Sequence, residues 1–246
     1  MQKKMIIISI FLLIILISNF PSKIIVAASD PWPPFVDSEN PNDGLSLEII
    51  RAAYATQGYE VKTEYVPWAR AETGVKEGFY DIIPNTWLTT KRTEYLYYSQ
   101  PYLFNNIKFI KLKDDEFEYE DLESLNEKVV GVIRGYGYGD AFLNDENFIR
   151  DDANDLITNI RKLLIGRIDL TLEDEIVARI ILEREDPTLL DQIEFVKKPL
   201  SVQALYITSG YSNPRHIEFI DAFNKGLEII INNGTYDKIL ENYGIN

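Results

Sequence analysis

The residues best suited to binding chemistry lie in a polar stretch that follows a short apolar segment. Residues 81–83 predict a buried strand that ends at Pro84, so residues 85–92 leave the strand end as an irregular loop, a usual place for ligand contacts. The loop carries an indole, two hydroxyl groups and a guanidinium, from Trp87, Thr89, Thr90 and Arg92. A guanidinium is a planar, permanently charged group that can bind a carboxylate through two hydrogen bonds. For Arg92 taken alone, pairing with a surface acid such as Glu94 is the favoured interpretation.

The other two tryptophans of the chain are predicted to lie beside the same loop. Residues 23–29 indicate a buried strand, and the proline-rich sequence 30–35 that follows carries Trp32 away from the strand end. Trp68 follows a proline at the predicted start of a helix. Core packing would scatter these residues, so Trp32, Trp68 and Trp87 together indicate an aromatic site for an apolar or cationic group. The structural alternative for Trp32 is packing beneath its prolines.

A glycine-rich segment in the second half of the chain is a further candidate binding loop. Residues 128–133 indicate a buried strand, and the sequence from Gly135 to Gly139, which includes Tyr136 and Gly137, precedes a predicted helix. The glycine spacing is not G-x-G-x-x-G, and no acidic partner follows at the required distance, so nucleotide binding is rejected. Backbone N–H groups at a helix start can still bind an anionic group.

Three consecutive acids, residues 173–175, begin a predicted helix after a strand over residues 170–172. Acids at a helix start are stabilised by the helix dipole, which is a sufficient structural reason for them. Residues 153–164 predict the preceding amphipathic helix, with Asn154 or Asp152 as its cap.

Composition predicts a folded, acidic protein without redox or metal chemistry. At 246 residues, with 46% hydrophobic and 12% aromatic residues, the chain can form one large or two small packed domains. It contains no cysteine, which excludes a disulfide framework, a thiol nucleophile and a lipid anchor on cysteine. The formal charge of −14 repels nucleic-acid phosphates, so we expect no nucleic-acid partner. His216, the single histidine, has no neighbouring ligand spacing typical of a metal site, and we predict neither a metal nor a cofactor.

The first 22 residues are predicted to be a secretory signal peptide. Two lysines precede an apolar run of about 13 residues, which is short for a membrane span of roughly 20 residues. Cleavage at the small residues 26–28 would cut through the first predicted strand, so we expect cleavage between Ser18 and Ser22. An uncleaved membrane anchor is the alternative.

The loop that contains Arg92 resembles the signature of the bacterial extracellular solute-binding proteins of family 3, the periplasmic amino-acid-binding group. The signature is a Gly, an Asp-led strand, a loop that ends in Thr and Arg, and an aromatic-Ser-x-Pro-Tyr sequence. Here these elements are Gly78, Asp81, Thr89, Arg92 and residues 98–102. The sequence 166–169, followed by Asp174 and Glu175, matches a second motif of the family.

The resemblance extends over residues 23–246 and implies the α/β fold of type II periplasmic binding proteins. In this fold, two lobes, each a mixed sheet flanked by helices, enclose a ligand cleft. We expect chain crossings near residues 104–107 and 204–206. Lobe 1 would then contain residues 23–104 and 206–246, and lobe 2 would contain residues 105–205.

Roles for individual residues are also implied by the resemblance. Arg92, with Thr89 beside it in the signature, would bind the α-carboxylate of the ligand, and Asp174 would bind its α-ammonium. Trp32 and Trp68 correspond to aromatic residues that contact the ligand.

Two positions depart from the family pattern. Tyr136 and Gly137 lie in the binding loop of the second lobe, where the family usually has small hydroxyl residues. Trp87 also stands where a small hydroxyl residue is usual. These departures predict a narrowed site, or one altered for a larger or differently charged solute.

We therefore expect a monomeric, non-catalytic periplasmic receptor for a small polar molecule, an amino acid or a related compound, that feeds an ABC-type transporter or a sensor. The alternative is a cleft enzyme, because a few relatives are dehydratases that act on small carboxylates, and Glu173 could serve as acid or base. A sensing module of a longer signalling chain is a third possibility, disfavoured because the sequence ends soon after its last predicted helix.

Overall fold

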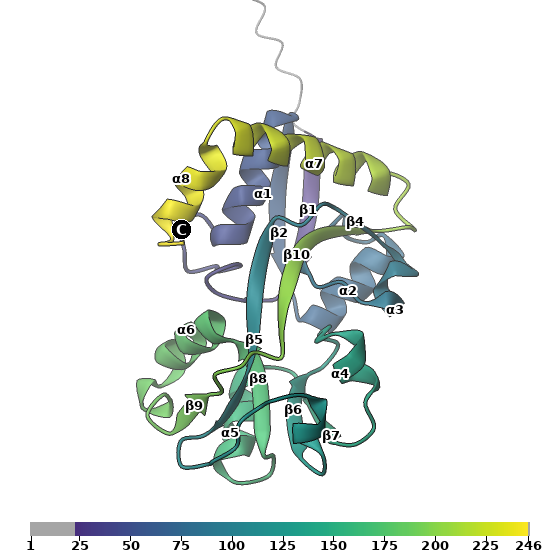
Figure 1. Cartoon of the computed structure of the whole chain (residues 1–246). Coiled ribbons are helices and arrows are strands. Elements are labelled where there is room, and N and C mark those ends of the chain that lie inside the picture. The colour runs from purple at the N-terminus through teal and green to yellow at the C-terminus, as the bar shows by residue number, and fades with distance from the viewer. Residues whose placement is uncertain (1–22, 246) are drawn as a thin grey trace, which may run out of the picture.

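The computed structural model describes residues 23–245, which form two lobes joined by two long strands (Figure 1). The predicted signal peptide, residues 1–22, lies outside the described residues. The joining strands are β5 (Leu103–Leu112) and β10 (Ser201–Gly210), which pair antiparallel from Leu103–Leu205 to Ile107–Ser201. The lobe boundaries at 104/105 and 205/206 stay a prediction, since both strands continue without a break through this region. No helix among residues 23–245 is long and apolar enough to cross a membrane.

Lobe 1 contains the N-terminal strands and both ends of the described chain. Its strands are β1 (Lys23–Ser29), β2 (Tyr59–Tyr65), β3 (Ile83–Thr86) and β4 (Leu96–Tyr98). Its helices are α1 (Leu45–Thr56), α2 (Trp68–Glu77), α3 (Thr90–Thr93), α7 (His216–Asn232) and α8 (Thr235–Asn242). Strands β1 and β2 pair in parallel, whereas β3 and β4 pair antiparallel with β10.

Lobe 2 is built on the second half of β5, where residues 107–112 pair with β8 and β9. Its strands are β6 (Val129–Ile133), β7 (Ile149–Ala153), β8 (Leu170–Asp174) and β9 (Ile193–Phe195). Its α-helices are α4 (Asp140–Asn144), α5 (Leu156–Leu164) and α6 (Glu175–Glu185), and its 3-10 helices are η1 (Leu122–Leu125) and η2 (Pro187–Leu189). Strand β6 pairs in parallel with β7 and β8, while β5 pairs antiparallel with β8 and β9.

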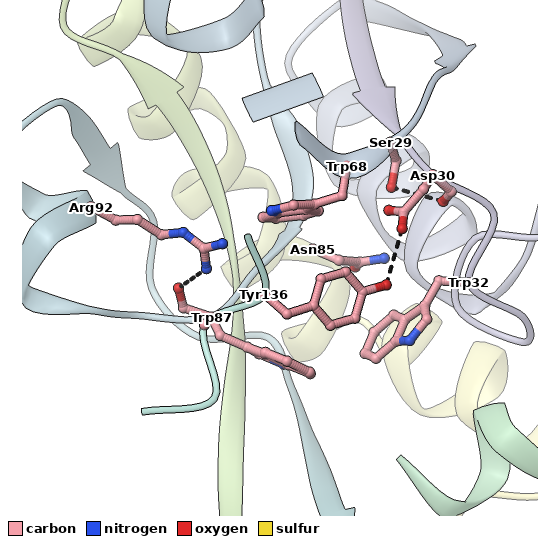
Figure 2. Close-up of a pocket in the computed structure, with 9 residues that line it drawn as sticks. Ser29, Asp30, Trp32, Trp68, Asn85, Trp87, Arg92 and Tyr136 are labelled. Carbon is pink, nitrogen blue, oxygen red and sulfur yellow. Dashed lines mark hydrogen bonds between the residues drawn. The ribbon is translucent and has the colours of Figure 1, made fainter. Parts of the chain in front are cut away.

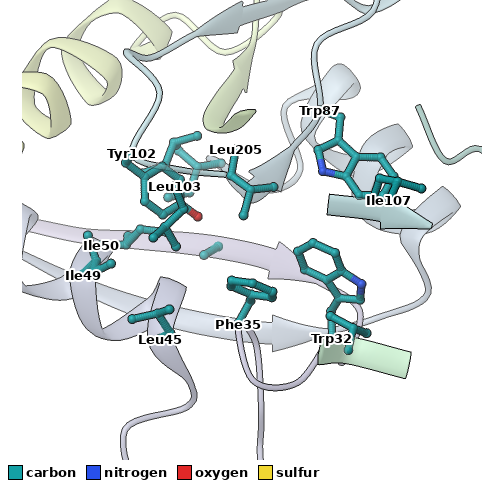
Figure 3. Close-up of a cluster of buried hydrophobic side chains, with 14 of the residues drawn as sticks. Trp32, Phe35, Leu45, Ile49, Ile50, Trp87, Tyr102, Leu103, Ile107 and Leu205 are labelled. Carbon is teal, nitrogen blue, oxygen red and sulfur yellow. The ribbon is translucent and has the colours of Figure 1, made fainter. Parts of the chain in front are cut away.

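Apolar periodicity explains how these elements pack. Leu45, Ile49 and Ala53 recur on one face of α1 and are fully buried, where they face the sheet and α7. The same core contains Trp32 and Phe35, whose rings stack with centroids 4.8 Å apart (Figure 3). A residue near the predicted ligand site is thus also part of the lobe 1 core.

Hydrogen bonds between β1 and the segment before β3 bring two binding loops together. The N–H of Ala28 donates to the carbonyl of Ile82 at 3.0 Å, and the Asp81 carboxylate accepts from the N–H of Val26 at 2.8 Å. The carboxyl ends of the two strands therefore lie side by side, which places the loop with Trp32 next to the loop with Trp87.

The structure corrects four local predictions. Strand β8 extends to Asp174 and α6 begins at Glu175, so residues 173 and 174 belong to the strand and not to the helix. Pro84 does not end a strand, because it lies inside β3; the register with β10 shifts between Tyr206 and Thr208, so the ladder does not require an N–H from the proline. The loop after β3 is not wholly irregular, since it ends in the short helix α3. Helix α5 is capped by Asp155, whose side chain accepts from the N–H of Thr158, because residues 149–153 continue as β7.

Candidate functional site

All three tryptophans lie around one small cavity at the junction of the lobes. Each is at least nine-tenths buried, and the rings of Trp32 and Trp87 meet edge to face with centroids 5.8 Å apart. The cavity is lined by Ser29, Asp30, Trp32, Trp68, Asn85, Trp87, Arg92, Tyr136 and Gly137. Its volume of about 20 Å³ has room for about one water molecule, because side chains from both lobes fill the space.

Tyr136 fills most of the space between the tryptophans. Its ring lies 5.5 Å from that of Trp87 and 5.7 Å from that of Trp68, nearly perpendicular to both, as Figure 2 shows. Its hydroxyl donates to a carboxylate oxygen of Asp30 at 3.0 Å. Tyr136 belongs to the loop after β6 in lobe 2, whereas the other groups belong to lobe 1. We call Trp32, Trp68, Trp87 and Tyr136 the aromatic box.

Arg92 is buried and has several hydrogen-bond partners. Its Nε donates to the Glu72 carboxylate at 2.8 Å, and Nη1 donates to the carbonyl of Trp87 at 2.9 Å. Nη2 donates to the carbonyl of Gly135 in lobe 2 at 2.7 Å, and the guanidinium lies 4.8 Å from the ring centre of Trp68. One N–H on each terminal nitrogen remains for another acceptor. The carboxylate that balances Arg92 in this structure is therefore Glu72, from the chain itself.

Thr89 and Gly137 shape the surroundings of Arg92. The side chain of Thr89 caps α3 by accepting from the N–H of Arg92 at 3.3 Å, and Thr89 lies outside the residues that line the small cavity. A Cβ atom on Gly137 would approach Nη1 of Arg92 to 2.5 Å and Cγ2 of Thr89 to 2.9 Å. Gly137 is thus a glycine because the guanidinium passes directly over its backbone.

Asp174 is not brought to the cavity. One carboxylate oxygen accepts from the N–H groups of Ile176 and Val177 and caps α6, at 2.9 and 3.1 Å. The other accepts from the backbone N–H of Asn106 and the side-chain amide of Asn105, at 3.2 and 3.4 Å. The arrangement expected for a zwitterion, with Arg92 and Asp174 at opposite ends, is therefore not assembled here, because Asp174 has a structural role in the helix cap.

Glu173, the preceding residue, faces the other way and approaches the aromatic box. Its side chain is fully buried; Oε1 accepts from the indole N–H of Trp32 at 3.2 Å and from the N–H of Asp174 at 2.8 Å. Oε2 has no hydrogen-bond partner among the described residues. Burial, together with the nearby Asp174 and Asp30 carboxylates, raises the pKa of Glu173 to about 8.

Asp30 has a similar but smaller perturbation. Desolvation raises its pKa to about 6, although the hydrogen bond from Tyr136 favours the ionised form. Near pH 7 the site therefore combines a mostly ionised Asp30 with a mostly protonated Glu173.

A larger cleft of about 990 Å³ adjoins the small cavity and shares Asp30, Trp32, Trp68 and Tyr136 with it. The charged residues that line this cleft are mostly acidic: Asp30, Asp37, Glu39, Asp155, Glu173 and Glu185, against Arg134 and Arg184. Arg184 donates to both oxygens of Asp37, at 2.9 and 2.8 Å. The cleft between the lobes is therefore acidic, and both of its arginines already have acidic partners, since Nε of Arg134 lies 3.7 Å from the Asp152 carboxylate.

Contacts across the cleft hold the two lobes together. The carbonyl of Gly135 accepts from the indole of Trp68 at 3.0 Å as well as from Arg92. Thr90 contacts the carboxylate of Asp140 through its backbone N–H and its hydroxyl. With the Arg184–Asp37 pair on the opposite side, these bonds define a closed arrangement.

Several groups of the site were not predicted from the sequence. Glu72 lies four residues after Trp68, so both occupy one face of α2, and this spacing is a signal that was available. Asp30 and Asn85 line the cavity from the loops that carry Trp32 and Trp87. The side-chain nitrogen of Asn85 is buried and, among the described residues, has no partner.

Two α/β lobes are connected by a pair of crossing strands and enclose an aromatic cavity at their junction. This is the architecture of a periplasmic binding protein. The chain belongs to the bacterial extracellular solute-binding proteins, family 3, whose family model matches residues 24–246. This confirms the resemblance seen in the sequence and the two-lobed α/β fold.

Solved structures of similar fold agree with this assignment. An amino acid ABC transporter substrate-binding protein, AbpA from Streptococcus pneumoniae, bound to L-arginine, is 21% identical with a TM-score of 0.71, covering 90% of this chain and 94% of that chain. Holo ArgBP from T. maritima is 19% identical with a TM-score of 0.71, covering 90% and 96%. A histidine kinase sensor domain with similarity to periplasmic binding proteins is 18% identical with a TM-score of 0.77, covering 89% and 95%. At these identities the similarity concerns the fold.

Proposed function

We propose that this protein is a monomeric periplasmic receptor that binds a small polar solute, an amino acid or a related compound, and presents it to an ABC-type permease. The observation that carries the proposal is the aromatic cavity at the lobe junction, which receives side chains from both lobes. A ligand that contacts both lobes is bound fully only in the closed state, so binding and closure are coupled. Residues 1–22 would direct export in this proposal.

Within this proposal, the aromatic box forms the walls of the site and Arg92, with Gly137 and Thr89 beside it, forms one end. The two remaining N–H groups of Arg92 can donate to an anionic oxygen of the solute. Tyr136 fills the space between the tryptophans here, so the closed state that holds a solute would have Tyr136 displaced from that space; a movement of lobe 2 permits this, since the backbone of Tyr136 belongs to lobe 2 and the tryptophans belong to lobe 1. Asp174 is not part of the proposed contact set, because all of its observed hydrogen bonds serve the helix cap and β5.

The proposal is tested by isothermal titration calorimetry of the mature protein against a panel of amino acids and amines. The expected result is saturable binding of at least one compound, accompanied by a change in small-angle X-ray scattering that reports lobe movement. Thermal stabilisation that grows with ligand concentration provides an independent readout. A panel without any binder, together with unchanged scattering, would contradict a receptor function for this cleft.

A second candidate, a cleft enzyme acting on a small carboxylate, is favoured by one observation. Glu173 is a buried acid whose raised pKa of about 8 keeps it protonated near neutral pH, as a general acid requires. Incubation with the binding compound, followed by NMR, separates the candidates. A receptor returns the compound unchanged, whereas an enzyme converts it and loses that conversion in Glu173→Gln.

A further inference from the structure

Oε2 of Glu173 is one of two buried polar atoms of the site, with the side-chain nitrogen of Asn85, that have no hydrogen-bond partner among the described residues. Buried carboxylate oxygens are almost always hydrogen-bonded, and an unpaired one is costly unless a ligand completes it. Trp32 and the N–H of Asp174 both serve Oε1, so Oε2 is left for a donor from elsewhere. Glu173 lines the large cleft, from which such a donor could arrive.

The charged groups nearest to Glu173 are negative. Asp174 follows it in the chain, and Asp30 lies across the lobe junction; both raise its pKa through their charges. Among residues 23–245, Glu173 takes part in no ion pair. The rings of Tyr136 and Tyr138 lie 5.9 Å apart, and burial raises both phenol pKa values well above the usual range; the charges of Asp30 and Glu173 add to this for Tyr136, and that of Glu173 adds to it for Tyr138. The surroundings thus contain acceptors and rings but no cation for this acid.

The opposite end of the site offers little positive charge. Arg92 is paired with Glu72 at 2.8 Å, and two backbone carbonyls take further donors from it. A ligand carboxylate placed there would share the guanidinium with the Glu72 carboxylate. This weakens the attraction that an unpaired arginine would exert.

We propose that the cleft selects a small organic cation, whose ammonium, guanidinium or amidinium head pairs with Glu173 and Asp30 against the rings of the aromatic box, and that an α-carboxylate is not required. The inference rests on the proposed receptor function and specifies its ligand class. Aromatic faces bind such cations through their negative quadrupole, and the acidic cleft concentrates them. An N–H group of the cationic head donates a hydrogen bond to Oε2 of Glu173. Another takes the place of the Tyr136 hydroxyl as the donor to the Asp30 carboxylate.

The first test compares matched ligands by calorimetry. Arginine and citrulline differ mainly in the charge of the head group, whereas arginine and agmatine differ in the carboxylate; putrescine extends the set of carboxylate-free cations with N–H donors. We expect at least one carboxylate-free cation to bind and citrulline and glutamine to bind at least tenfold more weakly than arginine or agmatine. Citrulline binding as tightly as arginine, or binding of arginine without any carboxylate-free cation, overturns the inference while leaving a receptor function intact. If no solute of any charge binds, both proposals fail.

The second test examines Glu173 directly with the tightest cation found. Glu173→Gln is expected to weaken binding at least tenfold, since it removes a buried charge partner. Glu185→Gln is the matched control: this acid also lines the cleft but is partly exposed and pairs with Arg161, and its loss should change affinity less than about threefold. Equal losses in the two variants would show that only the overall charge of the cleft matters, which overturns the assigned contact.

Proton release provides a readout that a purely structural role would not change. Near pH 7, Glu173 carries its proton in most free molecules, and a cation beside it favours the ionised form. Binding should therefore release about one proton, seen as a dependence of the calorimetric enthalpy on the buffer, and affinity should increase as the pH is raised from about 6 to about 8. Proton release that persists in Glu173→Gln, or the absence of proton release in the wild type, overturns the assigned contact between the cation and Glu173.

Discussion

Replacing Glu173 with glutamine should stabilise the folded protein, by an amount that depends on pH. The folded state holds a proton on Glu173 up to about pH 8, whereas an unfolded chain loses it near 4.5. Between these values the unfolded state binds fewer protons, so the wild-type protein loses stability as the pH rises. Glutamine is neutral and of similar shape, and it therefore resembles the protonated acid at every pH.

The size of the effect follows from the two pKa values. Each pH unit above 4.5 costs the wild-type protein about 1.4 kcal/mol relative to a neutral side chain. The expected gain for Glu173→Gln is therefore about 3 kcal/mol at pH 7, and it should vanish below about pH 4.5. A gain of this size is unusual, because most core substitutions lower stability.

Urea unfolding, followed by far-UV circular dichroism from about pH 4 to about pH 8, measures this difference. Glu185→Gln is the control, since its partly exposed carboxylate pairs with Arg161, and its removal should change the free energy of unfolding by less than about 1 kcal/mol. A Glu173→Gln protein that is less stable than the wild type at pH 7, or a difference that does not vary with pH, would refute the argument from burial.

Three further predictions concern packing and the aromatic box. Arg92→Ala should lower the free energy of unfolding by about 3–5 kcal/mol in the same urea assay, because it leaves the largely buried Glu72 carboxylate without its cation and removes a donor from the carbonyls of Trp87 and Gly135; a loss below about 1 kcal/mol would contradict this role. Gly226→Ala should cost about 1–3 kcal/mol, since a Cβ there would lie 2.1 Å from the carbonyl oxygen of Ala53, and unchanged thermal unfolding would show that α1 and α7 can move apart freely. Ligand binding should change tryptophan emission, and each single Trp→Phe variant should reduce that change without removing it; one variant that abolishes the whole signal would contradict a shared box.

Much of the local structure was predictable because it depends on neighbours in the chain. The apolar run of residues 23–29 forms β1 with the predicted bounds, and α2 begins at Trp68, directly after the proline that predicted a helix start. The signature around Arg92 was sufficient to identify the family, and the matching family model confirms it. Trp32 and Trp87 lie on loops at strand ends and Trp68 begins α2, so their approach to one site followed from the expected fold.

Other features depended on contacts between residues far apart in the chain. Pro84 could lie inside β3 only because the register of β10 shifts beside it, which no pattern around residue 84 reveals. Helix α5 begins later than predicted because residues 149–153 form β7, which pairs in parallel with β6. Short-range periodicity cannot report such pairings, since strand partners are chosen by the fold as a whole.

The chemistry of the site was decided by tertiary structure. In the sequence, Glu173 and Asp174 are equivalent acidic neighbours. In the structure their side chains have different partners: Asp174 caps the N-terminus of α6, whereas Glu173 accepts a hydrogen bond from Trp32 and has one oxygen unpaired. Arg92 was recognisable as a ligand-binding candidate, yet its partner Glu72 became known only from the position of α2. The sequence determined which charged and aromatic groups are present and which loops carry them. Their pairing, burial and pKa values arise when two lobes meet, because the strength of each electrostatic contact depends on distance and on the exclusion of water.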